Sequence, residues 1–311
     1  MAKVLGILGN ARKDGYTIRV LREALKAASE KPNVKTELIH LLDYKFGPCR
    51  SCYECIRNSR HRCILQDDMG EKGRLWRKIE EANGLIIASP VHLWTADALT
   101  HLFMERLYPY VWSGELRGIP VMTITVASNQ GFHIAANRIL CEWAFTLGMK
   151  YVGGLPVHAA HMDRSLREAR YLGKILGEEA LKDEKEGRKS PTDLDHWLRY
   201  QDSPWKVYPN YIENLTMGTG DPEFSIIRYA LSYETFRRKE AVDLLKKADE
   251  EFRRFAHQYQ MGNHEDAIRH LVRASAFWTH ATWKEFLEEQ LIKAPPPKTY
   301  RPIEKINRSC S

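Results

Sequence analysis

Four of the six cysteines lie close together in the sequence, as Cys49, Cys52, Cys55 and Cys63. Two residues lie between Cys49 and Cys52 and two between Cys52 and Cys55, and seven residues lie between Cys55 and Cys63. When such a loop curls, its thiols converge on one small volume, and one longer reach completes the four thiolates that a 4Fe-4S cluster needs. Zinc sites usually combine two separate Cys-x2-Cys pairs. Here the two Cys-x2-Cys pairs share Cys52, so the spacing fits zinc less well. The spacing therefore favours an iron-sulfur cluster, with structural zinc or free redox thiols as the alternatives.

The compartment decides how these cysteines are interpreted. Six cysteines in 311 residues are too few for a disulfide framework. The N-terminus enters a short apolar strand without a signal-peptide pattern, and no apolar run approaches the ~18 to 20 residues that span a bilayer. We therefore expect a cytoplasmic protein with no membrane span, in which clustered thiols indicate metal or redox chemistry.

Composition and charge narrow the function class. The chain is 43% hydrophobic and 28% charged, which is typical of a globular protein with one large domain or two ordinary ones. The net charge is +7, but its basic residues are mixed with acids in helix-like segments such as 237–240 and 246–250. This pattern is typical of solvated helix faces, so we expect no nucleic-acid partner.

A second group of candidate functional residues lies near the N-terminus, in segment 9–17. Small and polar residues there follow a strand and open a helix, where backbone N–H groups can hold a phosphate monoester, helped by Arg12 and the Thr17 hydroxyl. A P-loop is excluded because no Lys-Ser/Thr pair follows Gly15, and a dinucleotide fingerprint because its three spaced glycines are absent. An ordinary polar turn is the alternative.

The elements that position these residues alternate regularly. The predicted strands are residues 3–8, 35–41, 84–89, 121–127 and 151–156, and the predicted helices are residues 17–30, 70–82, 96–108, 135–148 and 164–183. Strict alternation predicts a parallel sheet that is covered on both faces, with the loops after the strands gathered along one edge. A cofactor should bind at that edge.

Two more loops follow neighbouring central strands of this sheet. Their residues are Ser89-Pro90-Val91-His92-Leu93-Trp94 and Ser128-Asn129-Gln130-Gly131. Both loops lie at the carboxyl ends of adjacent central strands, where this kind of sheet binds its ligands. A plain strand–helix connection is the alternative for each loop.

The remainder of the chain changes character after residue 183. We predict a domain over 1–183, a linker rich in aromatics over 184–222, and a helical region with a basic tail over 223–311. Helices over 237–260 and 264–290, separated by Met261-Gly262-Asn263, predict an antiparallel hairpin. Core packing is the simplest role of the linker aromatics, and covering a cofactor or binding a partner is the alternative; they are Trp197, Tyr200, Trp205, Tyr208 and Tyr211.

These motifs resemble those of NADPH-dependent FMN reductases and iron-sulfur flavoproteins. Segment 9–17 is similar to their Gly-Ser-Pro-Arg-x-x-Gly-Asn-Thr phosphate loop, with Asn10, Ala11 and Tyr16 as the departures. Segment 89–92 is similar to their Ser-Pro-Val-Tyr, with His92 in place of Tyr. Segment 63–69 resembles Cys-x-Ile/Leu-x-Asp-Asp-Met, in which either aspartate can cap the following helix. The likeness covers about residues 3–182.

The resemblance implies a flavodoxin-like, doubly wound, five-stranded parallel sheet with an additional mainly helical C-terminal region. It implies an electron-transfer flavoprotein that uses FMN and a 4Fe-4S cluster, with a ferredoxin-like protein or NAD(P)H as donor, and a homodimer or homotetramer. The implied FMN-binding residues are Gly9, Asn10, Arg12, Gly15, Tyr16, Thr17, Ser89, Pro90, Val91, His92, Leu93, Trp94, Ser128, Asn129, Gln130 and Gly131, and the implied cluster ligands are Cys49, Cys52, Cys55 and Cys63.

Redox transfer of this kind requires no general acid, so we assign no catalytic acid or base, and His92 and His133 are interpreted as structural groups. Two other functions remain open. One is a cluster-free NAD(P)H-dependent FMN or quinone reductase with zinc on the cysteines. The other is a redox-sensing binding module whose output is the helical C-terminal region.

Overall fold

The computed structural model describes residues 1–10, 12–129, 131–201 and 212–287. The chain forms two compact units, residues 1–191 and 192–311. Within the described ranges, no helix combines the length and the apolar character needed to cross a membrane.

The first unit is built on a parallel sheet. Its strands are β1 (Ala2–Leu8), β2 (Val34–His40), β3 (Gly84–His92), β5 (Pro120–Ala127) and β6 (Lys150–His158), in the spatial order β2-β1-β3-β5-β6. A two-residue strand, β4 (Thr95–Ala96), pairs antiparallel with the end of β3. This is the flavodoxin-like order, and the predicted fold class is confirmed.

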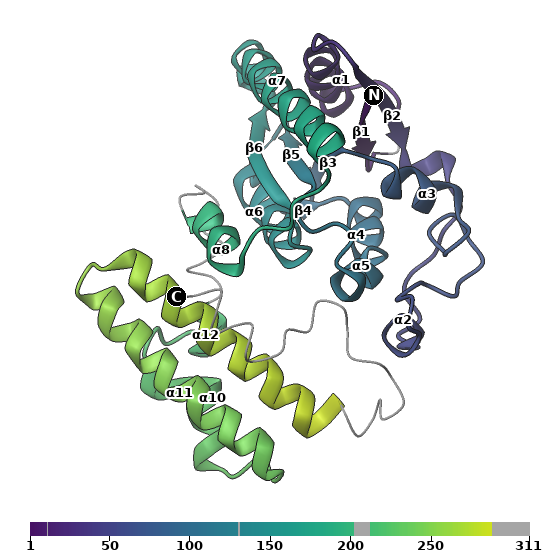
Figure 1. The fold of residues 1–311 in the computed structure, drawn as a ribbon. Coiled ribbons are helices and arrows are strands. Elements are labelled where there is room, and N and C mark those ends of the chain that lie inside the picture. The colour runs from purple at the N-terminus through teal and green to yellow at the C-terminus, as the bar shows by residue number, and fades with distance from the viewer. Residues whose placement is uncertain (11, 130, 202–211, 288–311) are drawn as a thin grey trace. The chain divides into compact units, whose positions relative to one another are not determined.

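Helices cover both faces of the sheet (Figure 1). Helices α1 (Tyr16–Ser29) and α7 (Met162–Glu186) pack together on one face, and α4 (Ala98–Glu105) and α6 (His133–Thr146) contact the other. Close contact between α1 and α7 depends on Gly173, because a Cβ atom there would lie 2.3 Å from the Ala24 carbonyl oxygen. Only glycine allows that approach of the two backbones.

All five predicted strands of the sheet are present. The two central strands β3 and β5 are apolar and buried along most of their length, as central parallel strands must be. The predicted helix over 96–108 is instead two helices, α4 and α5 (Tyr108–Ser113). Pro109 lies in the first turn of α5, where its missing N–H costs nothing, but it could not continue α4. The predicted helix over 70–82 is shortened to α3 (Arg74–Glu80).

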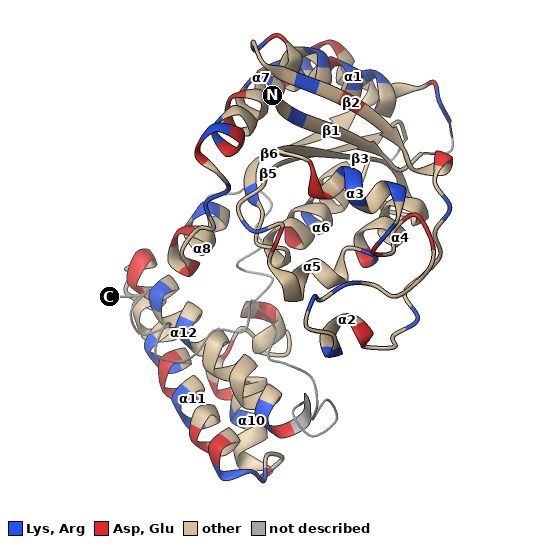
Figure 2. Ribbon diagram, turned by 45° about the vertical axis from the view of Figure 1, so that its right-hand side comes forward, with Lys and Arg blue, Asp and Glu red and all other residues tan. Residues whose placement is uncertain are grey.

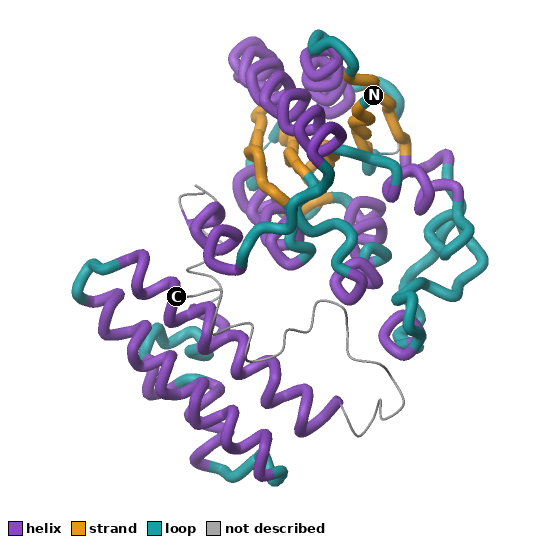
Figure 3. Tube along the Cα trace, viewed as in Figure 1, coloured by secondary structure: helices purple, strands orange, loops and turns teal. Residues whose placement is uncertain are grey.

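The long connection between β2 and α3 carries the cysteines. It is mostly loop (Figure 3), with a single 3-10 turn, η1 (Leu41–Asp43), and a short helix, α2 (Glu54–Arg57). Its last residues cannot join α3 because they turn tightly on themselves. A Cβ at Gly73 would lie 2.2 Å from the Asp68 carbonyl oxygen, so the chain folds back there before α3 begins.

The second unit is helical. It contains α8 (Asp193–Gln201), the short turn η3 (Pro222–Phe224), α10 (Ile226–Ser232), α11 (Lys239–Gln260) and α12 (His264–Thr282), followed by the π-turn η4 (Trp283–Leu287). Helices α11 and α12 form the predicted hairpin, with Gly262 at φ 77° in its turn. Acidic and basic residues are interspersed along both helices (Figure 2), as predicted for solvated faces.

The aromatic residues that precede this hairpin are described in part. Trp197 and Tyr200 of α8 are buried, as core packing predicts. Trp205, Tyr208 and Tyr211 lie outside the described residues, as does the basic tail.

Candidate functional site

A cleft of about 610 Å³ opens at the carboxyl edge of the sheet, where the loops after β1, β3 and β5 meet. Most of the predicted FMN-binding residues line it: Asn10, Arg12, Tyr16, Thr17, Pro90, Val91, His92, Leu93, Trp94, Ser128, Asn129 and Gly131, together with Val126, Ala127 and Phe132. Gln130 lies outside the described residues. The structure therefore brings all three predicted loops to one cleft.

The N-terminus of α1 forms one end of this cleft and suits an anion. No side chain caps this helix, and its first turn contains no acidic residue. Its free N–H groups and its dipole are therefore available to a phosphate, beside Arg12 and Thr17. The side-chain oxygen of Asn10 accepts a hydrogen bond from the Arg12 N–H at 3.2 Å, which fixes the turn that leads into the helix.

Three predicted residues, Gly9, Gly15 and Ser89, do not line the cleft. Gly15 is the N-cap residue of α1, at φ 139°. The fully buried Ser89 hydroxyl donates to the Asp97 carboxylate at 2.7 Å, and the Asp97 N–H donates back to Ser89 Oγ at 2.9 Å. These residues support the loops of the cleft without lining it.

The position of Gly9 is equally constrained. A Cβ there would lie 1.8 Å from Thr100 Oγ1, so the backbone of the loop after β1 packs directly on the first turn of α4. Asp97 caps the same turn, accepting from the N–H groups of Leu99 and Thr100. The N-terminal end of α4 therefore supports both the first and the second cleft loops.

An exposed aromatic pair lies at the cleft. The rings of Trp94 and Phe132 stack with centroids 4.4 Å apart and planes inclined by 7°. Leu93, Trp94 and Phe132 all have positive φ, a conformation that costs free energy in non-glycine residues and is concentrated at functional sites. The pair offers a flat apolar surface to a planar ligand. Sequence reasoning missed Phe132, although an aromatic directly after Gly131 was the available signal.

The loop after β5 is held from the neighbouring strand. His158 Nδ1 accepts from the Ala160 N–H at 3.2 Å, so the neutral ring carries its proton on Nε2 and donates to the Asn129 carbonyl at 2.9 Å. His133 does not line the cleft. Burial, together with the charges of His158 and His161, lowers the pKa of His133, which favours its neutral ring.

The four predicted cluster ligands line a second cavity, of about 450 Å³. This cavity lies between the cysteine loop, defined here as residues 47–68, and helices α4 to α6, and its wall includes Tyr53, Tyr108 and Trp143. Burial, together with the charges of the other three cysteines, raises the pKa of Cys55 to about 12, so the four thiols lie within electrostatic reach of one another. Within the described ranges, no three His, Cys, Asp or Glu side chains are already arranged as a metal site. The donor set is that of an iron-sulfur or zinc centre, and its sulfurs share one cavity.

The C-terminal end of α4 anchors this loop. Arg106, only 2% exposed, forms a bidentate ion pair with Asp67 at 2.7 and 2.8 Å and donates to the Gly47 carbonyl at 2.7 Å. The neighbouring Glu105 accepts from the Cys49 N–H at 3.1 Å. One turn of helix thus fixes both ends of the cysteine loop.

Asp68, the second aspartate of the Asp-Asp-Met motif, closes the base of the loop. Its carboxylate accepts from the Lys45 N–H at 2.7 Å and pairs with Arg74 at 2.9 Å. The predicted side-chain cap of the next helix is absent: α3 has Gly73 at its N-cap with no side-chain hydrogen bond. Instead, the Asp68 carbonyl accepts from the N–H groups of Leu75 and Trp76.

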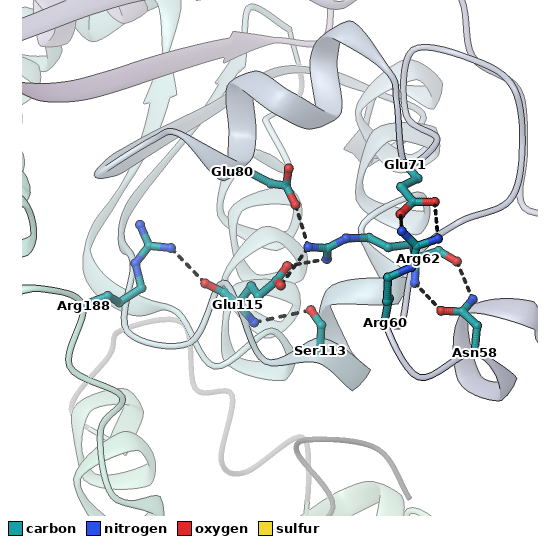
Figure 4. Close-up of polar contacts among 8 residues, drawn as sticks. All are labelled: Asn58, Arg60, Arg62, Glu71, Glu80, Ser113, Glu115 and Arg188. Atoms are coloured by element: carbon teal, nitrogen blue, oxygen red, sulfur yellow. Dashed lines mark hydrogen bonds and ion pairs between the residues drawn. The ribbon is translucent and has the colours of Figure 1, made fainter. Parts of the chain in front are cut away.

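A second anchor holds the loop beside Cys63 (Figure 4). Arg62 forms a bidentate ion pair with Glu115 and another with Glu80 at 2.8 Å. The Glu115 carbonyl accepts from Arg188 at 2.8 Å, and the side-chain oxygen of Asn58 accepts from the Arg62 N–H at 3.1 Å. The cysteine loop is thereby tied to α3 and to the segments before β5 and after α7.

Comparison with known proteins places these features among flavoproteins. A family described as NADPH-dependent FMN reductase matches residues 2–162. An iron-sulfur flavoprotein of Archaeoglobus fulgidus is 31% identical over 204 residues, which cover 64% of this chain and 88% of that protein. An iron-sulfur flavoprotein of Methanocaldococcus jannaschii is 36% identical over 191 residues, which cover 57% of this chain and 96% of that protein.

Proposed function

Because the chain belongs to the iron-sulfur flavoprotein branch of the NADPH-dependent FMN reductase family, and is a flavin-dependent oxidoreductase, we propose that it transfers electrons through an FMN in the 610 Å³ cleft and a 4Fe-4S cluster on the cysteine loop. The observation that carries the proposal is the convergence of four thiols on one cavity of a loop that is anchored at both ends.

The residues of the cleft suit the parts of FMN. The N–H groups at the start of α1, with Arg12 and Thr17, would hold the phosphate. The loop over 90–94 and the ring of Phe132 would contact the flat face of the flavin, and the loop over 128–131 its polar edge. FMN accepts two electrons and releases them singly, which matches a cluster that carries one electron at a time.

Helix α4 connects the two proposed centres within one chain. Its first turn supports the FMN cleft through Asp97 and Thr100, and its last turn holds the cysteine loop through Glu105 and Arg106. At 1.5 Å per residue, the eight residues of α4 span about 12 Å. A rigid helix of this length keeps the supports of both centres at a constant separation.

In this proposal the electron donor is a ferredoxin-like protein or NAD(P)H, and the protein acts as a homodimer or homotetramer. The net charge of +7 supports an acidic protein donor, since opposite charges speed the encounter of electron carriers.

The test is the visible spectrum and metal content of protein purified without oxygen. We expect flavin bands over a broad iron-sulfur absorption, with iron near four per chain and FMN bound. The Cys55→Ser variant should lose the iron and keep the FMN, while Cys141→Ser, outside the loop, should keep both. Zinc in place of iron, or iron-free protein after anaerobic reconstitution, would refute the cluster and favour a cluster-free reductase.

A further inference from the structure

We propose that Arg106 is a positioning residue that raises the reduction potential of the bound cluster by donating an N–H to the sulfur of Cys63. This inference rests on the proposed function, because it requires a cluster on the cysteine loop. Cys63 is the ligand with the longest spacing from the others, so its placement depends most on contacts from outside the loop.

The geometry of the guanidinium carries the argument. Its two terminal nitrogens donate to Asp67, one of them also to the Gly47 carbonyl, and the other lies 3.5 Å from Cys63 Sγ. A guanidinium is a planar fork with fixed donor directions. Once Asp67 and Gly47 fix this fork, its orientation toward Cys63 is fixed as well.

Burial strengthens the contact between Arg106 and the Cys63 sulfur. Arg106 is 2% exposed, so water does not compete strongly for its donors. Asp67 neutralises the guanidinium, and the neighbouring carboxylate of Glu105 accepts from the Cys49 N–H. Because the net charge of the Arg106–Asp67 pair is zero, the directed N–H toward sulfur is its main influence on the cluster.

Hydrogen bonds to cluster sulfurs are one of the levers that set reduction potential. The reduced cluster carries one more negative charge, so an N–H directed at its sulfur stabilises the reduced form more than the oxidised form. The added electron comes from the donor of the proposed function, and no bond to Cys63 forms or breaks. Arg106 should therefore raise the potential.

The experiment compares Arg106→Lys with Arg62→Lys in full-length, anaerobic protein. Both arginines hold the cysteine loop through bidentate carboxylate pairs, but Arg62 pairs with Glu115 and Glu80. Of these two arginines, only Arg106 contacts a cysteine sulfur among the described residues. The readout is the midpoint potential of the cluster, followed by electron paramagnetic resonance during reductive titration. We expect Arg106→Lys to shift the equilibrium about tenfold toward the oxidised cluster, about 59 mV for one electron, and Arg62→Lys to leave it unchanged.

A second measurement uses the wild-type protein, in case Arg106→Lys does not retain its cluster. With arginine labelled by nitrogen-15, pulsed resonance of the reduced cluster should detect a labelled nitrogen coupled through the hydrogen bond, in wild type and in Arg62→Lys. Two results, obtained while wild type carries four irons, would overturn the role of Arg106 and leave the proposed function standing. One is the absence of this coupling, and the other is an equal midpoint potential in both variants. A wild type without iron would overturn the proposed function together with this inference.

Discussion

Replacing Asp97 with alanine should destabilise the first unit at the start of α4. Asp97 is 5% exposed; its Oδ1 accepts from the N–H groups of Leu99 and Thr100 at 2.9 and 3.1 Å, and its Oδ2 from the Thr100 hydroxyl at 2.8 Å. Losing a helix N-cap costs about 1 kcal/mol. Leaving the buried Thr100 hydroxyl without this acceptor costs about 1 to 3 kcal/mol more. The Ser89 hydroxyl retains an acceptor in the Pro90 carbonyl at 2.8 Å, so it adds little.

The expected loss is therefore about 2 to 4 kcal/mol in the free energy of unfolding. With a urea dependence of about 2 to 3 kcal/mol per molar, the unfolding midpoint should fall by roughly 1 M. The fluorescence of released FMN should be the probe, because it reports on the unit over 1–191, whereas a bulk helical signal combines both units.

The matched control is Asp163→Ala, an exposed aspartate in the first turn of α7. It should change stability by less than about 0.5 kcal/mol, as surface substitutions usually do. If Asp97→Ala and Asp163→Ala unfold at the same urea concentration as wild type, the network at the start of α4 does not stabilise the cleft, and the reasoning is wrong.

Three further predictions concern the cleft, the loop and pH. Gly9→Ala places a Cβ 1.8 Å from Thr100 Oγ1, so it should cost about 1 to 3 kcal/mol and weaken FMN binding; an unchanged Kd by flavin fluorescence would contradict this. Arg62→Ala removes an anchor of the cysteine loop, so limited proteolysis should cut the loop faster than in wild type, and an equal rate would show that the anchor is dispensable. Burial raises the pKa of Glu179, but the hydrogen bonds and charges of Lys150 and Lys182 together outweigh burial and hold the pKa below its ordinary value of 4.5. The stabilisation is present above that value and is lost as pH falls through the lowered pKa, so Glu179→Gln should flatten this acid-side decline in Tm; an identical profile would contradict it.

Much of the fold could be predicted because its signals are local. Five apolar segments alternate with amphipathic ones, and only a parallel sheet between helices buries both patterns. The break at Pro109 was also visible in the sequence, since proline cannot continue a helix, yet the amphipathic pattern runs across it and predicted one helix. Where two local signals compete, tertiary packing decides.

The candidate site also combines residues that the sequence predicted with residues that only the tertiary structure brings together. Loop segments such as 9–17 were predictable because strand ends in a parallel sheet share one edge. Phe132 was missed because its stacking on Trp94 joins loops from different strands. Arg106 was missed because the sequence shows only an arginine near the end of a predicted helix, with no sign of which carboxylate it meets.

The sequence by itself determined the residue types and the frame that holds them: four thiols in one loop, a small and polar turn between a strand and a helix, and a parallel sheet that brings the loops after its strands together. These follow from residue type and short spacing, which local geometry converts directly into structure. Only the tertiary structure decided how the cysteine loop is held, through Arg106 on Asp67 and Arg62 on Glu115. Each of those pairs joins residues dozens of positions apart, and no local rule states which buried charge will be neutralised by which distant partner.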